Sequence, residues 1–245
     1  MHRLRAAIPA ARIARYDKVC ADTDVDGMDL YRWASSVALA VFDDLGHLEV
    51  AMRSAMAREL AATYGVNWYE RVEILDEDTL ELISEAWQTG HLSKLDADSI
   101  VIHGKLVATL MFGFWVKILG KGGYQGTDED RSRRIYDTLL WKPALRRAFP
   151  EVGDFDRSRV ESAARRVRSL RNRIAHHEHI IWGVPIAGEQ DSSGTPVRLS
   201  LTEAHDTLIE LAGYVDKGLA GWLMENSRVH TLIEECPVWE GHLDL

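Results

Sequence analysis

The chain has 245 residues and a formal net charge of -9, from 29 Lys and Arg against 38 Asp and Glu. This length suits one large domain or two small ones, and a hydrophobic content of 46% excludes an intrinsically disordered chain. The acidic balance argues against broad coating of nucleic acid, although a local basic cleft remains compatible with it. Cys20 and Cys236 are far apart in the sequence. We therefore expect no disulfide framework and a reducing, cytoplasmic environment.

Helical periodicity dominates from the start of the chain. Residues 12–16 suit a first short helix, and no apolar run follows the basic start, so no secretory leader is expected. Residues 29–64 carry the strongest pattern, in which Gly46 is a point of kinking or division. The apolar residues of this pattern recur at steps of three and four: Leu30, Trp33, Val37, Val41, Leu45, Leu48, Met52 and Met56.

Further helices are expected along the middle of the chain. The apolar stretch at 100–119 predicts one buried helix, because the uncharged span between Lys105 and Lys117 is shorter than the roughly 20 residues that cross a bilayer. Glycines follow it and predict a helix stop. The other predicted helices are 76–87, 128–140, 143–149 and 156–175, the last with Asp156 as its N-cap.

The pattern changes after this last helix. Residues 180–186 and 197–200 resemble two short strands, with a polar, turn-rich segment at 188–196 between them. A helix over 202–223 and a final short helix from 228 complete the chain. The prediction is one mainly α domain over residues 1–245, a helical bundle with a motif helix at 156–176 and a small β-hairpin or ordered loop at 180–200.

The most informative segment lies at the end of the motif helix, where residues 171–179 combine arginines, an amide and three histidines. Arginine is a permanent cation whose shape matches phosphate oxygens, and histidine exchanges a proton near neutral pH. These are the side chains needed to cut a phosphodiester. The candidate catalytic residues are Arg171, Asn172 and His176, with His177 as the alternative acid–base.

A helical wheel separates Arg171 from the other arginines of this helix. Arg171 falls in the apolar sector with Leu170 and Ile174, where an unpaired guanidinium is costly. A structural explanation is a buried ion pair with Glu49, although Glu49 could instead pair with Arg53 four residues later. The other arginines fall outside the sector and suit an ordinary solvated face: Arg165, Arg166, Arg168 and Arg173.

The histidines also have a structural explanation, because a histidine near a helix C-terminus interacts favourably with the helix dipole. Zinc binding is a further alternative. Adjacent histidines point in different directions on a helix, however, and the chain has no Cys pair or His-Glu-x-x-His spacing. No metal and no cofactor is therefore expected in this protein.

The segment Arg171-Asn172-Arg173-Ile174-Ala175-His176 resembles the Arg-polar-x(3 to 5)-His motif of HEPN domains, and in particular the Abi-like proteins of bacterial abortive infection. Three other segments are similar to that family in the same order. They are the Tyr-x-Trp at residues 31–33, the Leu-Glu segment at 48–55 and the Phe-Gly-x-Trp at 112–115.

This resemblance implies a helical-bundle endoribonuclease that works without a metal, as a toxin in antiviral defence. Two copies of the motif helix would form one composite site in a homodimer, with RNA as substrate, and Glu49 and Arg53 would support Arg171. A toxic nuclease needs restraint, so a cognate antitoxin is an expected partner, and no membrane is. The alternative is a non-catalytic HEPN-like scaffold for dimerisation or RNA binding in phage defence.

Overall fold

The computed structural model describes residues 2–95, 101–238 and 243, and these are mainly helical, as predicted. The chain divides into two compact units. Unit 1 consists of Met1–Gly46, Ser169–Ile209 and Trp222–Leu245, and unit 2 of His47–Arg168 and Glu210–Gly221. The arrangement of all elements as one domain over 1–245 stays a prediction.

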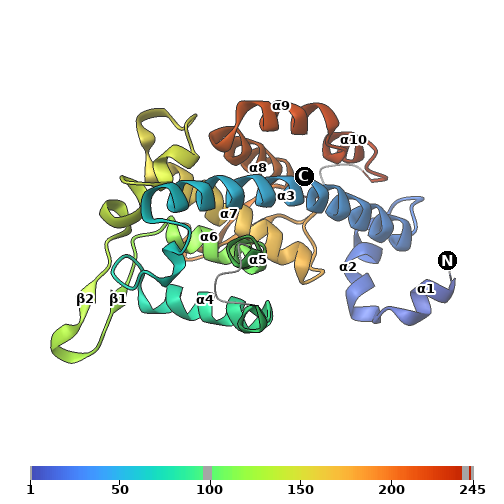
Figure 1. Cartoon of the computed structure of the whole chain (residues 1–245). Coiled ribbons are helices and arrows are strands. Elements are labelled where there is room, and N and C mark those ends of the chain that lie inside the picture. Colours follow the sequence, from blue (N-terminus) through green and yellow to red (C-terminus); the bar gives the residue numbers. More distant parts are fainter. Residues whose placement is uncertain (1, 96–100, 239–242, 244–245) are drawn as a thin grey trace. The chain divides into compact units, whose positions relative to one another are not determined.

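The helix α3, Gly27–Tyr64, is the longest element and is continuous over 38 residues (Figure 1). Gly46 does not divide it. The apolar pattern predicted for 29–64 is confirmed, because its members at three- and four-residue steps are buried, with Trp33 half-buried. Trp33 donates its indole N–H to the carbonyl of Leu232, at 2.6 Å. This bond ties the C-terminal segment of unit 1 to the first half of α3.

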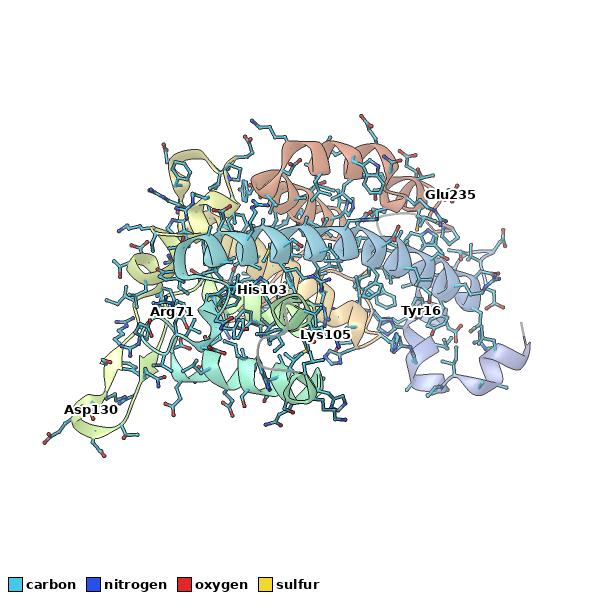
Figure 2. All side chains as sticks on the ribbon, viewed as in Figure 1. Tyr16, Arg71, His103, Lys105, Asp130 and Glu235 are labelled. Atoms are coloured by element: carbon cyan, nitrogen blue, oxygen red, sulfur yellow. The ribbon has the colours of Figure 1, made fainter. Side chains whose placement is uncertain are left out.

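Unit 1 opens with α1, His2–Ala7, and α2, Ala10–Cys20. The helix predicted for 12–16 therefore exists and is longer than expected. Its buried residues are Ile13, Tyr16 and Cys20. The ring of Tyr16, labelled in Figure 2, lies 5.3 Å from that of Tyr31 on α3. This edge-to-face contact is one that aromatic pairs favour, and it joins α2 to α3.

The predicted hairpin after the motif helix is confirmed, although its first strand begins at Val184 rather than at residue 180 and extends into the segment predicted as a turn. Strand β3, Val184–Gln190, pairs antiparallel with β4, Pro196–Leu199, with an irregularity between Pro185 and Gln190. Asp191 shapes the turn, because its carboxylate accepts the backbone N–H groups of Ser193 and Thr195. Such an Asx-type turn is the expected use of aspartate between two strands.

The helix predicted for 202–223 is two helices, α8, Leu201–Val215, and α9, Lys217–Asn226. The break falls at Asp216, whose carboxylate accepts the backbone N–H of Leu219 at 2.9 Å. A side chain that caps a new helix start competes with continuation of the preceding helix. The short final helix is confirmed as α10, Val229–Glu234.

In unit 2 the prediction of a single helix over 100–119 is wrong. Val101–Thr109 forms α5 and Phe112–Ile118 forms α6, at an angle of 94°. Ile100 lies outside the described residues. Within the described chain, none of the helices has by itself the length and apolar character needed to cross a membrane, although the bent α5–α6 pair has them jointly.

The helix predicted for 128–140 is also wrong. A hairpin of β1, Tyr124–Gln125, and β2, Ser132–Arg133, occupies this region, and Figure 2 shows Asp130 at its tip. Gly122 explains the outcome: its φ is +76°, and an added Cβ would lie 1.9 Å from the carbonyl oxygen of Arg134. A turn that requires glycine therefore overrides helical propensity.

The remaining elements of unit 2 are short apart from α4, Glu77–Thr89, which confirms the helix predicted for 76–87. The helix predicted for 143–149 is reduced to one turn. The short elements are 3₁₀ helices at Trp68–Glu70, Leu92–Lys94, Asp128–Asp130, Leu145–Ala148 and Gly153–Phe155, and a π-helical turn at Asp137–Trp141.

Asp76 caps α4 from a buried position, with 2% of the residue exposed. Its Oδ1 accepts the backbone N–H of Thr79 at 2.8 Å. Asp76→Ala should lower the free energy of unfolding by about 1–2 kcal/mol, because a buried N–H loses its acceptor. Denaturation in urea, followed by circular dichroism, measures this loss. Asp76→Asn is the control: it keeps a capping oxygen and should retain most of the stability, and an equal loss in both variants would contradict the capping role.

Candidate functional site

The motif helix is α7, Arg157–Ala175, which runs from unit 2 into unit 1. It begins where predicted, because the carboxylate of Asp156 accepts the backbone N–H groups of Ser158 and Arg159 at 2.8 and 3.4 Å. The apolar face predicted from the wheel is buried, including Val160, Ala164, Val167 and Leu170. Local sequence signals thus fix both the start and the rotation of the helix that carries the motif.

The helix ends at Ala175 in a Schellman turn. The backbone N–H of His177 donates to the carbonyl of Ile174 at 2.9 Å, and that of Glu178 donates to the carbonyl of Arg173 at 2.7 Å. This bond pattern requires a left-handed residue at the position that glycine usually occupies. Here that residue is His177, with a φ of +54°. A histidine at a position that favours glycine is a local cost, which suggests that the imidazole has a use there.

Helix α2, which is far from this turn in the sequence, contacts it through Arg12. Arg12 donates a guanidinium N–H to the carbonyl oxygen of His177. The same guanidinium lies 5.8 Å from the centre of the Tyr31 ring, within the range of a cation–π contact. Arg12 thereby fixes the backbone of the strained turn and adds a positive charge beside it.

Arg173 organises the segment after the turn. Its Nε and Nη2 donate to the carbonyl of His179 at 3.0 and 2.8 Å, and its Nη1 lies 2.9 Å from a carboxylate oxygen of Glu178. Only 21% of the side chain is exposed. The prediction that Arg173 belongs to a solvated basic face is wrong, because the chain folds back over it after Ala175.

His179 lies against an aromatic wall. Its Nδ1 is 2.7 Å from the hydroxyl of Tyr16, and its ring makes edge contacts with the rings of Tyr16 and Trp182. Arg15 packs on the ring of Trp182, with its guanidinium carbon 4.0 Å from the ring centre. Burial raises the pKa of Tyr16, so its hydroxyl stays protonated beside Nδ1 of His179.

The pKa of His179 is lowered, mainly by burial and further by the charges of Arg12, Arg15 and Arg173. His179 is therefore neutral at physiological pH in the folded protein. The unfolded chain, with a histidine pKa of about 6.5, takes up this proton at a higher pH than the folded chain does. Stability is thus present above the unfolded pKa and is lost as the pH falls below it.

We expect the free energy of unfolding to decrease between about pH 7.5 and 5.5, and His179→Phe to reduce the slope of this decrease. Phenylalanine keeps a ring against Tyr16 and Trp182 but has no titrating nitrogen. Chemical denaturation at a series of pH values measures the slope, and the wild-type chain at the same values is the control. An unchanged slope in His179→Phe would show that other groups control the acid response.

The turn at the end of α7 and the facing residues of α2 and α3 line a cavity of about 670 Å³ within unit 1. Its wall combines two arginines, Arg12 and Arg171, with the imidazoles of His177 and His179. Arg171 is half-buried, so it is not sealed in the interior. The remaining lining residues are Tyr16, Tyr31, Ala34, Ser35, Ala38, Leu39, Phe42, Ile174, Ala175, Glu178 and Ile180.

The structure brings only part of the predicted site to this cavity. Asn172 is half-buried and His176 is exposed, and the lining residues include neither. Glu49 and Arg53 are half-buried on the part of α3 that belongs to unit 2, where Arg53 donates to the carbonyl of Ala108 at 3.4 Å. The pairing of Glu49 with Arg171 or with Arg53 stays a prediction.

Sequence patterns did not identify Arg12, Tyr16 and His179 as site residues. Arg12 and Tyr16 are four residues apart on one helix, a spacing that places them on one face, but nothing local links them to the motif. As a whole, the cavity can bind a phosphate through its guanidinium groups and exchange a proton through an imidazole. The cavity therefore suits an anionic ligand whose reaction needs a proton donor or acceptor.

In the described part of the chain, the motif histidines do not form a group of three close metal-binding side chains. Such a group exists elsewhere in unit 1, at His205, Asp206 and His230. Comparison with models of known protein families, with curated proteins and with solved structures finds no match to this chain.

Proposed function

We propose that this protein is a metal-independent endoribonuclease with a HEPN-like fold, of the bacterial abortive-infection type, that acts on RNA as a homodimer. One observation carries the proposal. The turn that ends α7 brings His177 to the wall of the cavity that Arg171 also lines, and α2 adds Arg12 to the same wall. A phosphodiester needs this combination of fixed cations and a titratable imidazole.

The reaction that suits these groups is transesterification within the RNA strand. An imidazole accepts the proton of a 2′-hydroxyl, and the 2′-oxygen attacks the adjacent phosphorus. The bond from phosphorus to the 5′-oxygen breaks, and a second imidazole donates a proton to that oxygen. The products are a 2′,3′-cyclic phosphate and a 5′-hydroxyl. Proton transfer of this type contributes about 10²–10⁴-fold to the rate.

Arg171 has the electrostatic role in this scheme. The pentavalent transition state carries more negative charge on its equatorial oxygens than the bound substrate does, and a preorganised guanidinium stabilises that charge. Arg12 supplies a second cation, which compensates locally for the acidic balance of the chain. Asn172 would orient a histidine or donate to a phosphate oxygen.

Two histidines are needed, one as base and one as acid, and the two candidates differ in position. Both side chains are exposed, but His177 lines the cavity of its own chain and His176 does not. We assign His177 to the phosphate bound in the same chain. His176 is then available to a second copy, which accommodates both candidate residues in one composite site.

Exposed apolar side chains at the cavity support a homodimer. Leu39 is 69% exposed and Phe42 is 50% exposed, and both line the cavity. Burial of such side chains favours association by about 1.5–3 kcal/mol each when complete. A second copy of unit 1 against this face of α3 would cover them and bring two motifs together.

Leu39→Glu should therefore shift the protein from dimer to monomer and reduce RNA cleavage in parallel, because it places a charge in the proposed interface. Analytical ultracentrifugation measures the first effect and a cleavage assay the second. The control is Val50→Glu, which places the same charge on another exposed apolar residue of α3, 51% exposed, that does not line the cavity. A monomeric variant with full activity would contradict the composite site.

The function itself is tested with purified protein and a fluorescent oligoribonucleotide in the presence of EDTA. We expect cleavage with a 2′,3′-cyclic phosphate end, and no cleavage where one deoxyribose replaces the ribose at the cut site. Dependence on a metal, or equal cleavage of DNA, would contradict the mechanism. Binding of RNA without cleavage would instead support the scaffold function. The cytoplasmic location and the cognate antitoxin remain predictions.

A further inference from the structure

A second cluster of histidines in unit 1 lies outside the motif. His205 on α8 is completely buried, with 0% of the residue exposed. Its Nε2 lies 2.9 Å from Oδ2 of Asp44 on α3, a residue that is 4% exposed. The hydroxyl of Ser227 donates to the same carboxylate oxygen at 2.6 Å. These three residues come from distant parts of the sequence and form one buried polar network.

The network does not have the geometry of a hydrolase triad. In a triad the serine and the carboxylate bind opposite nitrogens of the imidazole. Here Ser227 and Asp44 both lie on the Nε2 side of His205, and the serine proton is directed to the carboxylate. No step of nucleophilic catalysis is available from this arrangement, so the buried histidine needs another explanation.

The other ring nitrogen of His205 supplies that explanation. A carboxylate only accepts hydrogen bonds, so Nε2 carries a proton, and in the neutral imidazole Nδ1 then presents a lone pair. Nδ1 is buried and has no hydrogen-bond partner within the described residues. Native proteins rarely leave a buried polar atom unsatisfied, and a bound ion is one of the explanations for such an atom. The lone pair of an imidazole is a preferred ligand of divalent transition metals.

Two further potential ligands lie beside His205. Asp206 follows His205 on α8, and His230 lies on α10 with its ring centre 5.2 Å from that of His205. One ligand atom from each of the three residues lies within 4.8 Å of the other two. Asp206 and His230 are exposed, so an ion can reach the group from solvent.

We propose that His205, Asp206 and His230 bind a divalent transition metal of the zinc class, with Asp44 as the carboxylate that orients His205. A carboxylate bound to the distal nitrogen of a metal-ligating histidine is a regular feature of zinc sites. Two imidazoles and a carboxylate leave one position of a tetrahedral zinc ion for water. The metal would connect α8 to α10 and satisfy the buried nitrogen.

The distances are compatible with this assignment. Ligand atoms about 2.0–2.1 Å from a tetrahedral zinc lie roughly 3.3 Å from one another. The three atoms must therefore approach each other from separations of up to 4.8 Å. His205 is held by its network, whereas the exposed side chains of Asp206 and His230 can rotate to close the site.

This inference does not depend on the proposed nuclease activity. It concerns other side chains, and cleavage is assayed with EDTA present, whereas metal binding is assayed without RNA. A nuclease that fails to bind zinc and a zinc-binding protein that fails to cut RNA are thus distinguishable results.

The experiment uses the full chain, stripped of metal with EDTA, dialysed and titrated with zinc sulfate by isothermal calorimetry. We expect one zinc ion per chain and a rise in the unfolding temperature with zinc. His230→Ala and Asp206→Asn replace exposed side chains and should still fold. His230→Ala should weaken zinc binding more than about 100-fold, beyond the usual loss of an outer-sphere partner. His91→Asn, at an exposed histidine of unit 2, is the control and should bind as the wild type does.

Three results would overturn the proposal. The first is wild-type protein that takes up no zinc, and the second is unchanged affinity in both His230→Ala and Asp206→Asn. The third is loss of the zinc in His176→Ala or His177→Gly, which would place the ion at the motif. Anomalous diffraction from zinc-soaked crystals provides the direct readout, because it shows which side chains surround the ion.

Discussion

Arg171→Ala should reduce the rate of RNA cleavage about 10²–10³-fold, the usual loss when one preorganised donor to a developing anion is removed. The wheel places Arg171 among apolar residues, and the structure places it half-buried on the cavity wall. Its position suits a contact with one phosphate rather than general attraction of RNA. The effect should therefore appear in kcat more than in KM. Single-turnover cleavage of a labelled oligoribonucleotide measures it.

The matched control is Arg168→Ala, which removes an exposed arginine one turn earlier on α7. Arg168 does not line the cavity of unit 1, and its replacement should leave the rate unchanged. Arg171→Lys keeps the charge but loses the planar fork, so an intermediate rate is expected. Circular dichroism of each variant shows whether the fold is retained. An equal loss of cleavage rate in Arg171→Ala and Arg168→Ala would show that Arg171 contributes only general positive charge.

His177→Gly should reduce cleavage about 10²–10⁴-fold, as expected for loss of a general base or acid. The substitution is informative because glycine is the residue that the Schellman turn favours at a φ of +54°. The helix end should therefore be preserved or stabilised while the imidazole is removed. Loss of activity with an unchanged or higher unfolding temperature would separate chemistry from folding, which an alanine variant at this position cannot do.

His176→Ala is the companion measurement. If each chain supplies His177 to its own cavity and His176 to its partner's, both variants lose activity. Mixing His176→Ala protein with His177→Gly protein should then restore part of it, since some heterodimers contain one intact site. Full activity in His177→Gly together with none in His176→Ala would assign all of the proton transfer to His176, against the division of roles proposed here.

The long helices were predictable because many residues in each contribute to the same apolar repeat. The pattern in 29–64 and the Asp156 cap each specify one structure, and α3 and α7 follow them. The stretch 100–119 has no glycine or proline at the break near Met111. Its division into α5 and α6 depends on tertiary packing that no local pattern reports. At 128–140, glycine turn geometry was the stronger determinant.

The site was predictable only where its residues share one helix. The wheel identified Arg171, because a cation in an apolar sector is visible within a few turns of sequence. Arg12 and Tyr16 reach the motif across separations of 165 and 163 residues, and no spacing rule extends over that distance. Arg173 was wrongly predicted to be solvated and His179 was not identified, because the chain reverses direction after Ala175 and covers the end of the helix.

The hydrogen bond from Arg12 to the carbonyl of His177 makes the turn at the end of α7 depend on α2, within the first twenty residues. If the proposed nuclease activity is correct, a protein that binds α2 could inhibit it without entering the cavity, because withdrawal of the Arg12 guanidinium would release the turn and remove part of the cavity wall. A neutralising partner would then need to recognise only the amphipathic helix α2 and not the interior of the cavity.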